Sequence, residues 1–128
     1  MDKIYFTLTG TKHYYGSKFM EPGMRVFLEK EPDNSFDKEA IQVKMEGIGK
    51  VGYVANSSFT VIGEAMSAGR LYDKIGDTAA GKIILVTDQG VLCKIGKKSL
   101  LGWKKELSVR EKEKFLERLE EEQEISFH

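Results

Sequence analysis

Hydrophobic and polar residues alternate along the first half of the chain, a period that is typical of half-buried β-strands. Four such runs cover residues 3–9, 24–28, 41–45 and 50–54. A dense turn cluster, residues 31–35, separates the second run from the third, and glycines close the first and third runs. The positions expected to point inward are Ile4, Phe6, Leu8, Met24, Val26, Leu28, Ile41, Val43 and Met45.

The period then changes. Val61, Ile62, Ala65 and Met66 recur at helical spacing, and they predict a short helix between Ser57 or Ser58 as N-cap and Gly69 as C-cap. Two β-rich runs, residues 82–87 and 91–95, predict a hairpin turning at Asp88-Gln89-Gly90. A capping-box pattern at Ser108 and Glu111 opens a charged helix to about Gln123.

Several short strands with one helix among them predict a mainly β fold, a small barrel with helical additions. We assign residues 1–103 to this barrel and residues 104–128 to the charged C-terminal helix, with Trp103 at the junction to pin the helix. The apolar stripe of that helix is narrow, so it is expected to dock on the barrel or on a partner.

Composition narrows the function classes. The 128 residues carry 20 basic and 20 acidic side chains, and this balance excludes a nucleic-acid binder driven by charge alone. Residues 104–128 hold six basic and eight acidic residues, which leaves 14 and 12 in residues 1–103. One cysteine and two histidines are a poor basis for a disulfide or a zinc site. With no apolar run long enough to span a membrane and no signal-peptide pattern, we expect a cytoplasmic protein without metal or cofactor.

No catalytic motif is found, and we do not expect an enzyme. The glycines at 47, 49 and 52 belong to a hairpin rather than a phosphate loop, because no helix starts there. Asp33, Asp37 and Glu39 could form a metal-binding group, but a turn with Asp33 as its Asx residue and Asp37 as a cap is favoured. Cys93 lies in an apolar strand and is expected to be a buried structural thiol.

One stretch resembles a known family. Residues 25–43 run from a strand through Glu31-Pro32, an Asn and a Phe-Asp pair to Ala-Ile and a second strand, which is similar to the signature of the HIRAN domain. The segment from Gly10 to Gly16 resembles the family's first loop, and Lys50 to Val54 resembles its Val-Gly strand. The resemblance covers about residues 4–87, with an added hairpin strand and the C-terminal segment beyond it.

The resemblance implies a modified OB-like or SH3-like barrel that binds DNA. In repair and fork-remodelling ATPases the domain holds the 3′-hydroxyl end of single-stranded DNA, and small stand-alone bacterial members also exist. By position, Lys12, His13 and Tyr14 match the loop that contacts the terminal nucleotides, while Asn34, Phe36 and Asp37 match the turn that receives the 3′ end. An aromatic face can stack an unpaired base, and a carboxylate can accept a hydrogen bond from a terminal hydroxyl.

The chain departs from the family at three places. Asp33 stands where binding members commonly have Asn, Phe36 replaces a Tyr, and Asn56-Ser57-Ser58 replace basic residues. We expect one of Tyr14 and Tyr15 to be exposed and the other, Tyr15, to be structural. Phe36 is expected in the core more than as a stacking platform.

The alternative to DNA binding is a protein-interaction or scaffold module that uses the barrel and the C-terminal helix. In that case a protein partner, or self-association through the helix, would replace DNA. The mixed Glu and Lys/Arg content of residues 104–128 suits helix–helix contacts.

Overall fold

A computed structural model describes residues 3–102, 113–114 and 116–120. Residues 3–102 contain six strands, one α-helix and two single-turn 3₁₀ helices, which we label η1 and η2. In chain order the elements are β1 (Tyr5–Thr9), η1 (Thr11–His13), β2 (Arg25–Lys30), β3 (Ile41–Met45), β4 (Gly49–Val54), α1 (Ala68–Tyr72), β5 (Thr78–Thr87), β6 (Gly90–Ile95) and η2 (Lys97–Ser99).

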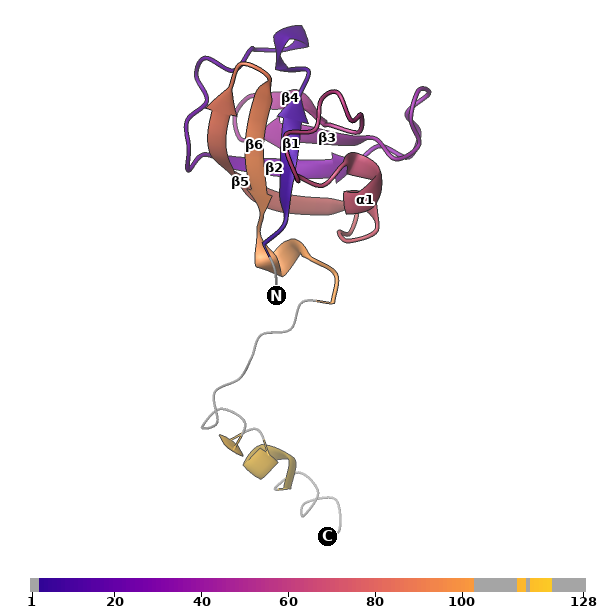
Figure 1. Cartoon of the computed structure of the whole chain (residues 1–128). Helices are drawn as coiled ribbons and strands as arrows, with labels where there is room; N and C mark the ends of the chain where they lie inside the picture. Colours follow the sequence, from indigo (N-terminus) through magenta and orange to yellow (C-terminus); the bar gives the residue numbers. More distant parts are fainter. Residues whose placement is uncertain (1–2, 103–112, 115, 121–128) are drawn as a thin grey trace.

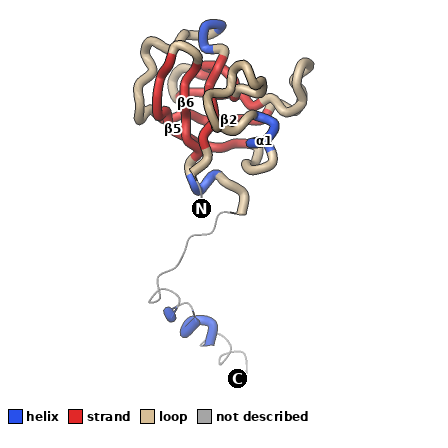
Figure 2. The backbone as a smooth tube through the Cα atoms, in the orientation of Figure 1, coloured by secondary structure: helices blue, strands red, loops and turns tan. Residues whose placement is uncertain are grey.

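The six strands form one closed antiparallel barrel in the order β1-β4-β3-β2-β5-β6. β1 closes it, because this strand pairs with β6 on one side and with β4 on the other. Figure 1 shows η1 at one end of the barrel, and the β2–β3 loop and α1 at one side. In Figure 2 the strands make the wall and the longer loops project from it. The mainly β, barrel-shaped fold predicted from the sequence is confirmed.

The core follows from the alternation along the strands. The inward positions of every strand are buried, and Ala68 and Leu71 of α1 join them. Fully burying a side chain of this size stabilises a fold by about 1.5–3 kcal/mol. The largest fully buried side chains are Phe6, Leu8, Leu28, Ile41, Leu71, Ile75, Ile83, Ile95, Val26, Val43, Val51 and Val91.

The helix predicted between Ser57 and Gly69 is wrong in its position. The structure has turns there, and α1 begins only after Ser67, whose hydroxyl accepts a hydrogen bond from the Arg70 N–H at 3.4 Å. Backbone groups of the segment bond instead to β1: Ile62 N–H donates to the Thr7 hydroxyl at 2.9 Å, and Met66 N–H to the Tyr5 carbonyl at 2.7 Å. These bonds replace a helical ladder, and the segment covers Thr7, which is fully buried.

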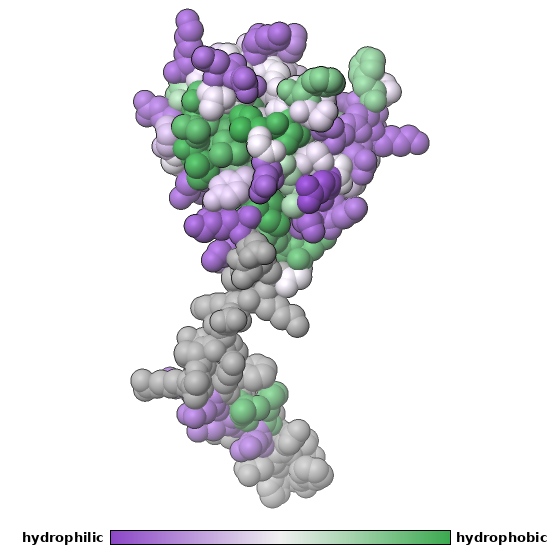
Figure 3. Space-filling view, in the orientation of Figure 1, coloured by the Kyte–Doolittle hydropathy of each residue, from purple (hydrophilic) through white to green (hydrophobic). Residues whose placement is uncertain are grey.

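Part of the outer surface of the β5–β6 hairpin is apolar. Figure 3 shows hydrophobic side chains gathered over these two strands. A bulge between Ile83 and Leu85 interrupts the alternation, so that the neighbours Ile84 and Leu85 are both exposed.

Little of the expected C-terminal helix is described. Residues 113–114 and 116–120 are helical, whereas Trp103 and the rest of the segment lie outside the described residues. Within the described part of the chain, no helix has the length and hydrophobicity needed to cross a bilayer.

Candidate nucleic-acid interface

The loop between β2 and β3 is a tight, self-bonded turn. Glu31 N–H donates to the Ala40 carbonyl at 2.8 Å and closes the base of the loop. Inside it, the Asn34 side-chain oxygen accepts hydrogen bonds from the N–H groups of Phe36 at 2.9 Å and Asp37 at 3.0 Å. Asn34, not Asp33 as expected, is therefore the Asx residue that fixes the backbone of the Phe-Asp pair.

Phe36 stands free at the tip of this turn. Its side chain is 97% exposed, so the expectation that it belongs to the core is wrong. The β2–β3 loop that carries it projects from the barrel wall (Figure 1). A solvated ring on a hydrogen-bonded backbone is available to a planar ligand.

Asp37 links this turn to a second loop. One carboxylate oxygen accepts the Glu39 N–H at 2.9 Å, as the predicted cap, and the other accepts the Asn56 side-chain amide at 3.0 Å. Asn56 in turn accepts the Gly69 N–H of α1 at 2.8 Å. A carboxylate has about four acceptor sites, so two remain open on Asp37. The sequence indicated Asn56 only as a departure from the family pattern, without a role.

A polar cluster of Glu31, Lys50 and Tyr53 holds the base of the turn on β4. Glu31 accepts hydrogen bonds from the Tyr53 hydroxyl at 2.8 Å, the Lys50 ammonium at 3.0 Å and the Asn34 amide at 3.1 Å. Partial burial works against ionisation of Glu31, but the bonds from Tyr53, Lys50 and Asn34 outweigh it and lower its pKa. The hydrogen bonds to Tyr53 and Glu31 raise the pKa of Lys50, and burial raises that of Tyr53. Sequence reasoning missed this cluster.

The predicted first loop forms η1 and the turn after it. The carbonyl of Thr11 accepts N–H bonds from Tyr14 at 2.9 Å and Gly16 at 2.8 Å, which curls the segment back on itself. Lys12 and His13 are exposed, Tyr14 is 40% exposed and Tyr15 is 64% exposed. The expectation that Tyr15 is structural is therefore wrong, since it is the more exposed of the two.

The structure brings some of the predicted site residues together and leaves others apart. Asn34, Phe36 and Asp37 share one turn, which hydrogen bonds tie to β4 and α1. The η1 segment follows Thr9, which pairs with Tyr53 of β4, so β4 lies between the two groups. No hydrogen bond among the described residues joins Lys12, His13 or Tyr14 to the turn.

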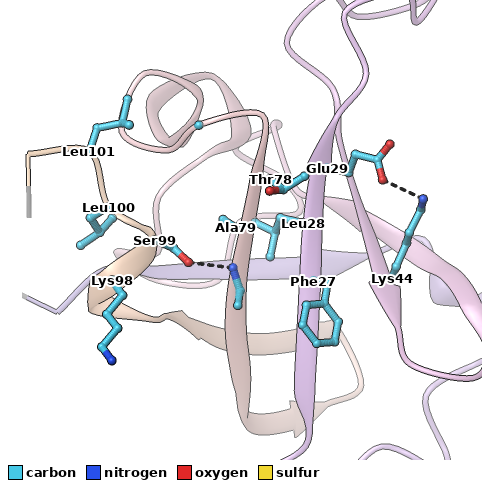
Figure 4. A pocket seen from close by; sticks show the side chains of 12 residues that line it. Phe27, Leu28, Glu29, Lys44, Thr78, Ala79, Lys98, Ser99, Leu100 and Leu101 are labelled. Atoms are coloured by element: carbon cyan, nitrogen blue, oxygen red, sulfur yellow. Dashed lines mark hydrogen bonds and ion pairs between the residues drawn. The ribbon is translucent and has the colours of Figure 1, made fainter.

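Other sequence candidates have structural explanations. Cys93 is fully buried, as predicted, and burial raises the pKa of its thiol to about 12. In the described ranges, no group of three His, Cys, Asp or Glu side chains could hold a metal ion. A separate hollow of about 560 Å³ lies between β2, β5 and η2. Figure 4 shows Phe27, Ala79 and Leu100 around it.

Comparison with known proteins agrees with the motif analysis. The HIRAN domain family model matches residues 1–98, which includes β6 beyond the predicted resemblance. A search of curated proteins gives no match. Among solved structures, the crystal structure of the HIRAN domain of human HLTF is 18% identical and covers 73% of this chain and 74% of that one, with a TM-score of 0.49. Because the family model spans more than half of its length, the chain belongs to the HIRAN domain family.

Proposed function

We propose that this HIRAN domain binds single-stranded DNA and holds its 3′-hydroxyl end at the turn from Asn34 to Asp37. HIRAN domains are a family of DNA-binding modules, which gives the class of ligand. The observation that carries the finer proposal is the pairing, in one rigid turn, of the 97% exposed Phe36 ring with the partly unpaired carboxylate of Asp37.

The two side chains supply complementary interactions. Stacking of the terminal base on Phe36 is worth about 1–3 kcal/mol. Asp37 accepts a hydrogen bond from the terminal hydroxyl, and its charge repels a terminal phosphate, so the turn selects against the wrong end as well as for the right one. The exposed Lys12, His13 and Tyr14 of the η1 segment are proposed to contact the preceding nucleotides through phosphate and ring.

Charge around the turn predicts modest affinity. Asp33 is exposed in the same loop, and the Lys50 ammonium is engaged by Glu31 at 3.0 Å. Lys38, which is exposed directly after Asp37, is the cation left in this loop for phosphates. We expect about two or three phosphate contacts, and since each contributes about −0.7 to the salt slope on a single strand, the slope should be small.

The experiment is fluorescence anisotropy at low salt with one labelled oligonucleotide that ends in either a 3′-hydroxyl or a 3′-phosphate. The wild-type protein should prefer the hydroxyl end by roughly tenfold, since a lost hydrogen bond to a charged group is worth about 1.5 kcal/mol or more. Asp37→Asn should remove most of that preference. The matched control is Asp33→Asn, which removes the same charge from the same loop and should keep the preference.

Thermal melting of both variants separates lost recognition from lost structure, because Asp37 also holds Glu39 and Asn56. Equal binding of the two ends by a folded wild-type protein would contradict end recognition. The absence of binding to either end would contradict the DNA proposal altogether.

A further inference from the structure

Three cations stand in register across neighbouring strands, at the end of β2 opposite to the β2–β3 turn. Arg25 of β2 is paired with Lys82 of β5, and Lys82 is paired with Lys94 of β6. All three point outward, since their strand neighbours Val26, Gly81 and Cys93 are buried. We refer to Arg25, Lys82 and Lys94 as the cationic row.

The row borders an open hollow without acidic side chains. The hollow has a volume of about 580 Å³, and Lys97 of η2 adds a fourth cation to its lining. Ala80, Gly81 and Gly96 also line it, and none of the three carries a long side chain. No ion pair in the described part of the chain includes any of the four cations.

The cationic row destabilises the folded protein, and the other cations of the barrel strands are not left uncompensated in this way. Like charges directly opposite each other on neighbouring strands are unfavourable. Elsewhere on the same sheet, Lys44 is neutralised by Glu29 at 2.7 Å and Lys50 by Glu31 at 3.0 Å, and Lys30 donates to the Ile75 carbonyl at 2.8 Å. In a chain of zero net charge, an uncompensated row therefore points to an anionic ligand.

The geometry fits a chain of phosphates better than a single anion. Paired strands are about 5 Å apart, so the three cations are set out along a line of about 10 Å. The Arg25 guanidinium lies 5.4 Å from the centre of the Phe27 ring. Its planar fork of donors matches the oxygens of a phosphate. Beyond this line, Lys98 stands at the edge of the neighbouring hollow in Figure 4.

We propose that the cationic row is a second nucleic-acid contact, which binds the phosphodiester backbone of the DNA away from its 3′ end. This proposal rests on the proposed function, because the same single strand of DNA is taken to be the ligand. Arg25 begins β2, whereas the β2–β3 turn follows Lys30 at the other end of that strand, about 17 Å away at about 3.3 Å per residue. The row therefore meets a part of the DNA other than the terminal nucleotide, and it contributes affinity without sequence or end preference.

The test measures the salt dependence of binding to a single-stranded 3′-hydroxyl oligonucleotide of about 20 nucleotides. Lys82→Gln and Lys94→Gln should each reduce the magnitude of the log–log salt slope by about 0.7, the value for one phosphate contact. Both should keep the preference for a 3′-hydroxyl over a 3′-phosphate. Lys74→Gln is the matched control, since Lys74 is exposed but lies outside the row, and its slope should equal that of the wild type.

The outcomes separate the two proposals. Unchanged slopes in both row variants, or an equal reduction in Lys74→Gln, would overturn the row while leaving end recognition intact. Tighter DNA binding by Lys82→Gln would also overturn the proposed role of the row. It would indicate that the row holds an acidic segment of protein instead of DNA. Reduced slopes without any end preference in the wild type would support the row and overturn end recognition. A wild type that binds no DNA would overturn both.

Discussion

Glu31 shows how one side chain can fix the position of a whole loop. Its two oxygens accept hydrogen bonds from Tyr53, Lys50 and Asn34, so it joins the β2–β3 turn to β4. Gln in its place would keep the shape but lose the charge that strengthens these bonds. We expect Glu31→Gln to lower the free energy of unfolding by about 1 kcal/mol at neutral pH.

The same variant should change the pH dependence. The pKa of Glu31 is lowered from 4.5 in the folded protein, so its contribution is fully present above about pH 4.5 and is lost as pH falls through the folded value. The stability difference between wild type and Glu31→Gln should therefore shrink as the solution is acidified, measured by urea unfolding at several pH values. Glu29→Gln, which removes an exposed ion pair, is the control with a smaller expected effect. A difference that stays constant down to pH 3 would contradict the assignment.

At the scale of single residues, the sequence predicts which residues form the β2–β3 turn but not which of their side chains are exposed. The spacing of Asn34, Phe36 and Asp37 identified the segment, and the structure places all three in one turn. The exposure of Phe36 and Tyr15 could not be predicted, because an aromatic residue between two strands suits core and surface equally well. The Asp37–Asn56 bond joins residues 19 apart, a contact that no local pattern contains.

The barrel is closed by a narrow contact between β1 and β4. Only two residue pairs, Leu8 with Val54 and Thr9 with Tyr53, are in register there. Gly52 allows this approach, because a Cβ at its position would collide with the Thr9 carbonyl oxygen and lie 2.8 Å from Leu8 Cδ1. A backbone oxygen cannot move aside without separating the strands.

We therefore expect Gly52→Ala to destabilise the protein by about 1–3 kcal/mol or more, measured as a lower urea midpoint with an unchanged slope. Gly76→Ala is the matched control. Its added Cβ meets nothing within 4 Å and Gly76 has no positive φ, so it should be neutral or stabilising by up to about 1 kcal/mol. Equal effects of the two substitutions would show that closure at Gly52 is not tight.

At the scale of secondary-structure elements, the alternation of hydrophobic and polar residues predicted the strands correctly, whereas helical spacing predicted a helix in the wrong place. Four strand runs and the β5–β6 hairpin were identified because each is a local pattern with a turn at its end. Residues 57–66 have helical spacing but lie against β1, where Thr7 and Tyr5 bond their backbone. Tertiary hydrogen bonds outweigh a weak local preference in a segment this short.

For the whole molecule, composition conceals the distribution of charge. Equal numbers of acidic and basic residues suggest a neutral surface, yet β2, β5 and β6 place cations side by side. Arg25 and Lys82 are far apart in the sequence and meet only through the pairing of β2 with β5. The candidate phosphate contact was therefore hidden from sequence reasoning, whereas the turn at Asn34 was visible in a contiguous motif.

A row of like charges that binds a ligand should lower the stability of the ligand-free protein, and the salt dependence of that stability should show the effect. In about 0.01 M salt the screening length is about 30 Å, so Arg25, Lys82 and Lys94 repel one another, whereas in about 0.15 M it falls to about 8 Å. Lys82→Gln should be more stable than the wild type at low salt by several tenths of a kcal/mol, and the advantage should shrink as salt is added. Urea unfolding of Lys82→Gln, with Lys74→Gln as control, measures the difference. A Lys82→Gln protein that is less stable at low salt would mean that Lys82 is already neutralised within the chain, and the row would then have no free charge to offer DNA.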